Sequence, residues 1–121
     1  MIEPTTEQEE KFAEELVMTL PSVIRVGLFD FRIEKLSGNQ CTNKFGECST
    51  VEQAIRIQRT MPTRYKAVDT FIHEVIHAIY WSYGAQDTDG EERMVELMAT
   101  GMSIVHRDNP WLVDWIKSAK L

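Results

Sequence analysis

The chain has 121 residues, of which 43% are hydrophobic and 26% are charged, and its formal net charge at pH 7 is −6. This length and composition predict one soluble globular domain spanning residues 1–121, with a real core but no room for a second domain. The acidic balance argues against nucleic acid as a partner, because phosphate binding requires a basic surface. No apolar run approaches the roughly 18–20 residues of a membrane span, and the acidic start lacks the features of a secretory signal. We therefore expect a cytoplasmic protein without a membrane partner.

Two cysteines, Cys41 and Cys48, lie in a segment that contains glycine and asparagine. They are too few for a zinc ribbon and too widely spaced for a redox C-x-x-C pair. In a reducing compartment they are expected to be free thiols, and a disulfide within a hairpin is the alternative. A redox function would require thiols of low pKa beside positive charge, and the segment offers Lys44 alone.

The first predicted element is an amphipathic helix. Thr6 and Glu9 have the spacing of a capping box. Apolar residues continue at helical intervals from Phe12 to Leu20, where Pro21 ends the run. The glutamates of this helix are expected to solvate its outer face.

About three strands are predicted to follow, forming a small antiparallel or mixed sheet. Apolar and polar residues alternate over residues 29–34, which is typical of a half-buried strand, and a turn is expected at residues 37–39. Residues 45–48 form a second, short candidate. The third strand is predicted over residues 51–58, where β-branched residues alternate with polar ones.

Three further helices are predicted, which makes the fold class α+β. Pro62 stands where one helix begins, and its pattern continues to Tyr83, with Gly84 as the C-cap. Glu91 opens the next helix, whose methionines have the spacing of core residues. Asn109 and Pro110 precede the last helix. The first of these two helices contains Met94, Val95, Met98, Met102 and Val105, and its methionines are expected to fill the core, with a methionine-lined pocket as the alternative. The last helix is expected to dock on the body through Trp111, Leu112, Trp115 and Ile116.

The chemistry is concentrated in residues 71–77, which read Phe-Ile-His-Glu-Val-Ile-His. His73 and His77 are four residues apart, so on a helix their imidazoles lie on one face, one turn apart, and can bind one ion. Glu74 lies about 100° away, where it can take a proton from a metal-bound water without becoming a ligand. With only three histidines in the chain, composition alone would produce H-E-x-x-H in about one of a hundred such chains. The pattern therefore predicts a zinc hydrolase.

The same helix has a separate core side. An apolar stripe on the face opposite the histidines consists of Val68, Phe71, Ile72, Val75 and Ile79. The metal face also includes, by helical angle, Lys66, Asp69, Thr70 and Tyr80.

A catalytic zinc normally takes three protein ligands and leaves a position for water, so a third ligand is needed. Glu92 and Glu96 lie one turn apart on one face of the next helix, so one can bind the ion while the other accepts the spare ring N–H of a histidine. His106 lies about 21 Å beyond Glu92 along a continuous helix and cannot share a site with it. Asp87 and Asp89 are better explained as loop and cap residues. The alternative is that both glutamates are merely exposed helix charges.

The motif HEVIHA, followed by Glu92-x-x-Val95-Glu96-x-Met98-Ala99, resembles the zincin metallopeptidases of the gluzincin type. It is most similar to the ImmA/IrrE-like group and to related short phage- and prophage-encoded proteins, in which H-E-x-x-H precedes a helix with an E-x-x-A-N-x-F-A-like pattern. This chain departs from that pattern at Val95 and Glu96, so the register of the third ligand stays open between Glu92 and Glu96.

The resemblance covers residues 51–106 and implies a minimal zincin-like domain. By it, His73, His77 and Glu92 are the zinc ligands and Glu74 is the general base. It also implies an edge strand before the active-site helix that aligns the substrate.

These observations predict a zinc-dependent metallopeptidase that acts on a protein or peptide through a water activated by Glu74. Zinc suits two imidazoles and a carboxylate, although manganese and iron stay open. If the strand at residues 51–58 is an edge, an extended substrate can pair with it. Tyr80 is the nearest candidate to stabilise an oxyanion, and simple packing between helices is its alternative. The rival hypothesis is a non-enzymatic adaptor or inhibitor stabilised by metal.

Overall fold

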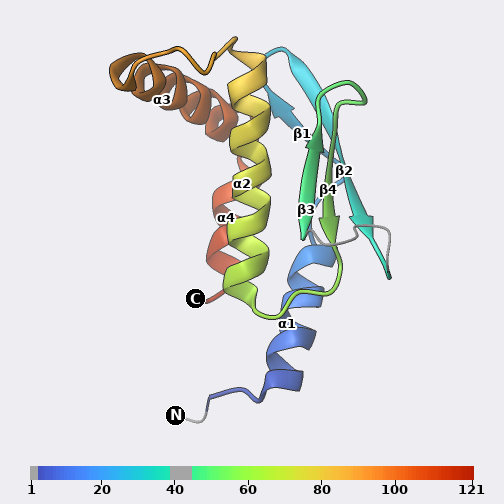
Figure 1. The fold of residues 1–121 in the computed structure, drawn as a ribbon. Coiled ribbons are helices and arrows are strands. Elements are labelled where there is room, and N and C mark those ends of the chain that lie inside the picture. Colours follow the sequence, from blue (N-terminus) through green and yellow to red (C-terminus); the bar gives the residue numbers. More distant parts are fainter. Residues whose placement is uncertain (1–2, 39–44) are drawn as a thin grey trace.

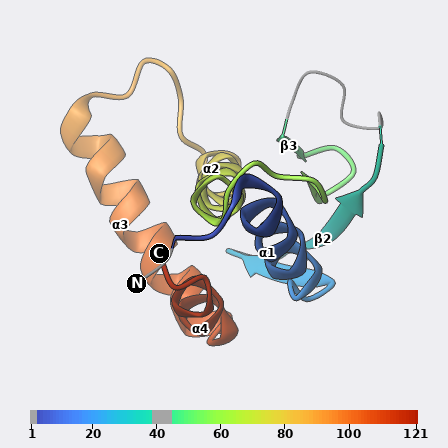
Figure 2. The same cartoon turned by 90° about the horizontal axis from the view of Figure 1, so that it is seen from below.

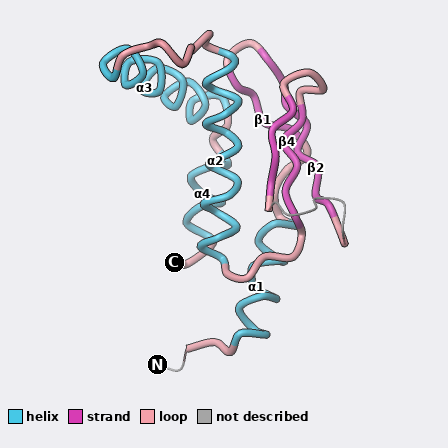
Figure 3. Tube along the Cα trace, in the orientation of Figure 1, coloured by secondary structure: helices cyan, strands magenta, loops and turns pink. Residues whose placement is uncertain are grey.

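The computed structural model describes residues 3–38 and 45–121, which form four helices and one four-stranded mixed sheet (Figures 1 and 3). The α+β class is as predicted. None of the helices in these ranges is long and apolar enough to cross a membrane. In chain order the elements are α1 (Thr6–Met18), β1 (Val23–Val26), β2 (Phe29–Leu36), β3 (Gly46–Ser49), β4 (Ala54–Gln58), α2 (Arg64–Ser82), α3 (Glu91–Asp108) and α4 (Trp111–Ser118).

The sheet has the order β1-β2-β4-β3. Strands β1 and β2 are antiparallel, β2 and β4 are parallel, and β3 and β4 are antiparallel. The sequence predicted about three strands, one fewer than the structure has. The additional strand is the short β1, which forms a hairpin with β2 around Gly27, whose φ is +60°. Asn39, the end of the predicted turn, lies outside the described residues.

The strand predicted over residues 51–58 begins only at Ala54. Val51 is 94% exposed, and Gln53 has a φ of 51°, so residues 50–53 form the turn between β3 and β4. Because β4 lies between β2 and β3, it is not an edge strand, so the condition under which a substrate could pair with residues 51–58 is not met. The edge beside the histidine helix is β3.

Side chains just before α1 and α2 cap the N-termini of these helices. At α1 the capping box is formed by Thr5 and Gln8, one residue before the predicted pair Thr6 and Glu9. Thr5 Oγ1 accepts a hydrogen bond from the Gln8 backbone N–H at 3.1 Å, and the Gln8 side chain accepts one from the Thr5 N–H at 2.9 Å. At α2, the Thr63 side chain accepts from the Lys66 N–H.

Helix α2 lies between the sheet and the pair α3 and α4, as the view from below shows (Figure 2). Phe71 and Val75 on its core side are fully buried. Helix α3 approaches it closely at Gly101, where an added Cβ would lie 2.3 Å from Ile79 Cγ2. Trp115 of α4, predicted to dock that helix, is buried and its Nε1–H donates to the Leu16 carbonyl at 3.0 Å. The position of α2 is thus fixed from both sides.

Candidate metal centre

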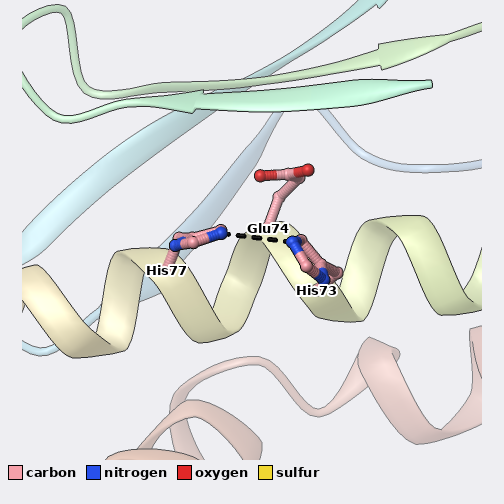
Figure 4. A group of neighbouring side chains, drawn as sticks. All are labelled: His73, Glu74 and His77. Atoms are coloured by element: carbon pink, nitrogen blue, oxygen red, sulfur yellow. Dashed lines mark hydrogen bonds between the residues drawn. The ribbon is translucent and has the colours of Figure 1, made fainter. Parts of the chain in front are cut away.

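The two motif histidines face each other on exposed turns of α2. His73 Nε2 and His77 Nε2 lie 3.1 Å apart (Figure 4). Two zinc–nitrogen bonds of about 2.0–2.1 Å would span this separation at an angle of about 100°, close to the tetrahedral value of about 109°. The two imidazoles therefore fit a shared zinc ion.

Glu74 lies beside this pair but is only 7% exposed. Its side chain points toward the strands (Figure 4), and one oxygen lies within 4.8 Å of a ring nitrogen of each histidine. The burial follows from β3, which approaches so closely that a Cβ on Gly46 would lie 3.3 Å from Glu74 Cγ and 2.8 Å from Thr70 Cγ2. Gly46 is a site residue that the sequence analysis missed, because only the strand packing reveals the need for a small residue there.

A cleft of about 630 Å³ opens between β3 and α2 above these three side chains. A second hollow, of about 170 Å³, adjoins it at His73 and Glu74. No residue of α3 lines either of them. The cleft is lined by Gly46, Glu47, Cys48, Thr50, His73, Glu74, His77, Tyr80 and Trp81, and the hollow by Phe45, Gly46, Lys66, Asp69, Thr70, His73 and Glu74.

Cys48 lines this cleft as a half-buried free thiol. Burial, and then the negative charge of Glu74, raise the pKa of Cys48 to about 11. A thiol with a raised pKa is a poor nucleophile and electron donor at neutral pH, so the structure gives no support to a redox function. Cys41, its possible disulfide partner, lies outside the described residues.

Tyr80 lines the cleft one turn beyond His77. Its hydroxyl donates a hydrogen bond to Asp87 Oδ1 at 2.6 Å, and this bond raises the pKa of Tyr80. A hydroxyl has one hydrogen to donate, so Tyr80 cannot stabilise an oxyanion while Asp87 holds it. Asp87, which the sequence favoured as a loop residue, thus contacts a residue that lines the cleft.

Glu92, the predicted third ligand, is not brought to the histidines. In the described residues the group of candidate ligands comprises His73, Glu74 and His77 alone, and Glu92 is exposed in the first turn of α3. It precedes Gly101, which packs on α2, by nine residues, so it lies about 180° around the helix from that contact. Glu96 is exposed as well, with Arg93 3.9 Å away.

Comparisons with protein-family models, with curated proteins and with solved structures find no match to this chain. The resemblance to zincins thus rests on the two motifs and stays a prediction. What fold and site define together is an α+β protein with a His-Glu-His group at the floor of a cleft beside an edge strand.

Proposed function

We propose that this protein is a zinc-dependent metallopeptidase with a zincin-like domain. The observation that carries the proposal is the pair of imidazole nitrogens 3.1 Å apart, next to a buried carboxylate and open to a cleft. In this proposal His73 and His77 hold the ion and Glu74 is the general base.

The position of Glu74 beside the two histidines supports its proposed role in proton transfer. Zinc, when bound, supplies a Lewis acid that polarises a carbonyl group and makes water acidic. The Glu74 carboxylate takes the proton from the attacking water and returns it to the nitrogen of the leaving amine. In this proposal Glu74, whose side chain points toward the strands (Figure 4), acts as the base rather than as a ligand. General acid–base catalysis of this kind typically contributes about 10²–10⁴-fold in rate.

The outer edge of β3, which no strand of residues 3–38 and 45–121 covers, is the proposed docking line for the substrate. Gln58 N–H donates to the Phe45 carbonyl on the β4 side, and in an antiparallel pair inward and outward backbone groups alternate. The N–H and C=O groups of Gly46 and Cys48 therefore face away from β4. An extended peptide can pair with them and place one of its carbonyls above the histidines.

The third ligand is proposed to be Glu92, with Glu96 supporting a histidine, or the reverse. In the present arrangement this requires the first turns of α3 to move toward the cleft. Metal titration of Glu92→Gln and Glu96→Gln tests this, because loss of a ligand should weaken zinc binding far more than loss of a supporting hydrogen bond. Equal, unchanged affinities in both variants would remove both residues from the site.

The second candidate is a non-enzymatic binding or inhibitor protein stabilised by metal. The position of Glu92 outside the His-Glu-His group favours it, because two histidines without a third ligand are fewer than a hydrolytic zinc site uses. In that case the ion would contribute to stability and the cleft would bind without cleaving.

The decisive experiment combines zinc analysis with a peptide-cleavage assay on a mixed peptide library read by mass spectrometry. His73→Ala should lose the metal, whereas Glu74→Gln should keep it and cleave at least a hundredfold more slowly. His106→Ala, outside the group, is the matched histidine control. If Glu74→Gln retains full activity, Glu74 is not the base. If the wild-type protein binds zinc but cleaves nothing in the library, the binding-protein alternative replaces the peptidase.

A further inference from the structure

Strand β3 and helix α2 run side by side in the same N-to-C direction (Figure 1), so the two ends of the cleft between them can be told apart. Phe45 lies near Lys66 in the first turn of α2, Gly46 contacts Thr70 and Glu74, and Thr50 lines the cleft with Trp81 at the far end. Antiparallel pairing is slightly more stable per residue than parallel pairing. A peptide paired antiparallel with β3 therefore has its C-terminal end toward Lys66.

Among the described residues that line the hollow at this end, Lys66 is the one cation. Its ammonium lies 5.2 Å from the centre of the Phe45 ring, and it forms no ion pair in the ranges of the chain that the structure covers. Two carboxylates share the hollow: Asp69 is exposed, and Glu74 lies at the His73 end. Glu47 also lines the cleft, and Tyr80 at its far end donates a hydrogen bond to Asp87, so acidic groups occur along the whole cleft. A substrate carboxylate would therefore find its cationic partner at the Lys66 end.

The spacing along α2 sets the length of peptide on that side. Lys66 precedes His73 by seven residues, or about 10.5 Å of helix axis. An extended chain rises about 3.4 Å per residue, so this distance holds about three residues. A shorter leaving segment would not reach the ammonium, and a longer one would extend beyond the hollow.

We propose that Lys66 binds the carboxylate of a peptide two or three residues beyond the scissile bond, which makes the substrate a short peptide cleaved near its free C-terminus. The proposal rests on the peptidase function. The carboxylate can be the chain terminus or an Asp or Glu side chain at the same position, and the geometry favours the terminus because the hollow is small.

Binding measurements test the proposal without requiring turnover. The probes are mercaptoacetyl-oligoalanines with one to four alanines, as free acids and as C-terminal amides, since their thiolate anchors them to zinc. Isothermal titration calorimetry on the zinc-loaded protein should show the two- and three-alanine acids binding about five- to tenfold more tightly than their amides. The preference should vanish in Lys66→Met and persist in Lys117→Met, an exposed lysine of α4.

Further probe compounds and controls distinguish a bound chain terminus from a bound side-chain carboxylate, and a failure of this inference from a failure of the proposed function. Amides that carry Glu as their last residue test a side-chain carboxylate: equal preference for these compounds would overturn the assignment to the chain terminus. Equal affinities of acids and amides at every length, or a preference that survives Lys66→Met, would overturn the proposal while leaving the peptidase intact. Zinc analysis of the same sample identifies the other failure, because a protein that takes up no zinc would overturn the proposed function and this inference together.

Discussion

The two edge strands of the sheet, β1 and β3, differ in what covers their outer backbone groups. At β1, the Asn109 side chain takes the place of a neighbouring strand: its Oδ1 accepts from the Arg25 N–H at 2.9 Å and its Nδ2 donates to the Arg25 carbonyl at 2.7 Å. Asn109 is only 4% exposed. At β3, no strand of the described chain covers the outer edge, and that edge faces the cleft with the histidines.

This difference suggests a division between an edge that stabilises the fold and an edge that can pair with another chain. An uncovered strand edge invites pairing with other chains, so proteins usually cover or charge such edges. Here the edge far from the histidines is closed by a side chain of the α3–α4 junction, while the edge beside them stays open. The closed edge contributes to stability, and the open edge is available to a second chain. Three predictions test this division, from the largest expected effect to the smallest.

Replacing Asn109 with alanine should open the closed edge. The change removes the two bonds to Arg25 and a third, from Nδ2 to the Val105 carbonyl at 2.9 Å. Because the partly buried backbone N–H and C=O of Arg25 lose these partners, the free energy of unfolding should fall by about 2–4 kcal/mol. Urea denaturation measures this change. Gln86→Ala, at an exposed amide side chain, is the control, and an equal, small effect of both changes would show that the edge does not depend on Asn109.

Gly46→Ala should disturb the open edge more mildly. Its Cβ would lie 2.8 Å from Thr70 Cγ2 and 3.1 Å from the Arg56 carbonyl oxygen, so β3 or α2 must shift, at a cost of about 1–2 kcal/mol. Thr70→Ser removes the nearest methyl group. In a double-mutant cycle by urea denaturation, Thr70→Ser should recover part of the loss caused by Gly46→Ala. No recovery would mean that the contact between β3 and α2 is not the source of the loss.

The third prediction concerns the pH dependence that Cys48 confers. Burial, and then Glu74, raise its pKa from the usual 9.0 to about 11. Between pH 9 and 11 the unfolded chain loses the thiol proton while the folded chain keeps it, so the free energy of unfolding should fall as pH rises through this window. Cys48→Ala, compared in a Cys41→Ser background, should flatten that part of the profile. Parallel profiles in urea denaturation at pH 8, 9 and 10 would contradict the assignment.

The local features of the chain were predictable from sequence. The helix from Arg64 to Ser82, its end before Gly84 and the buried Trp115 all follow from short-range signals: apolar spacing, a threonine cap and a glycine that accepts positive φ. The facing of His73 and His77 is also local, because four residues on a helix make one turn.

The long-range features were not predictable. The central position of β4 depends on its parallel pairing with β2, which no local pattern encodes. The closing of β1 by Asn109 joins residues 84 positions apart. Likewise, the register of Glu92 depends on how α3 packs at Gly101, which only the structure reveals. The sequence could thus identify the His-Glu-His group, but not which elements surround it.

The start of the histidine helix has a consequence for the dynamics of the whole molecule. The Arg64 guanidinium forms a double contact with Glu9 of α1, at 2.7 and 3.2 Å, and donates to the Ala119 carbonyl after α4 at 3.3 Å. It also lies 5.3 Å from the ring of Phe12. One side chain therefore couples three helices, so slow amide exchange near residues 9, 64 and 119 should be lost together as one cooperative unit rather than by independent fraying.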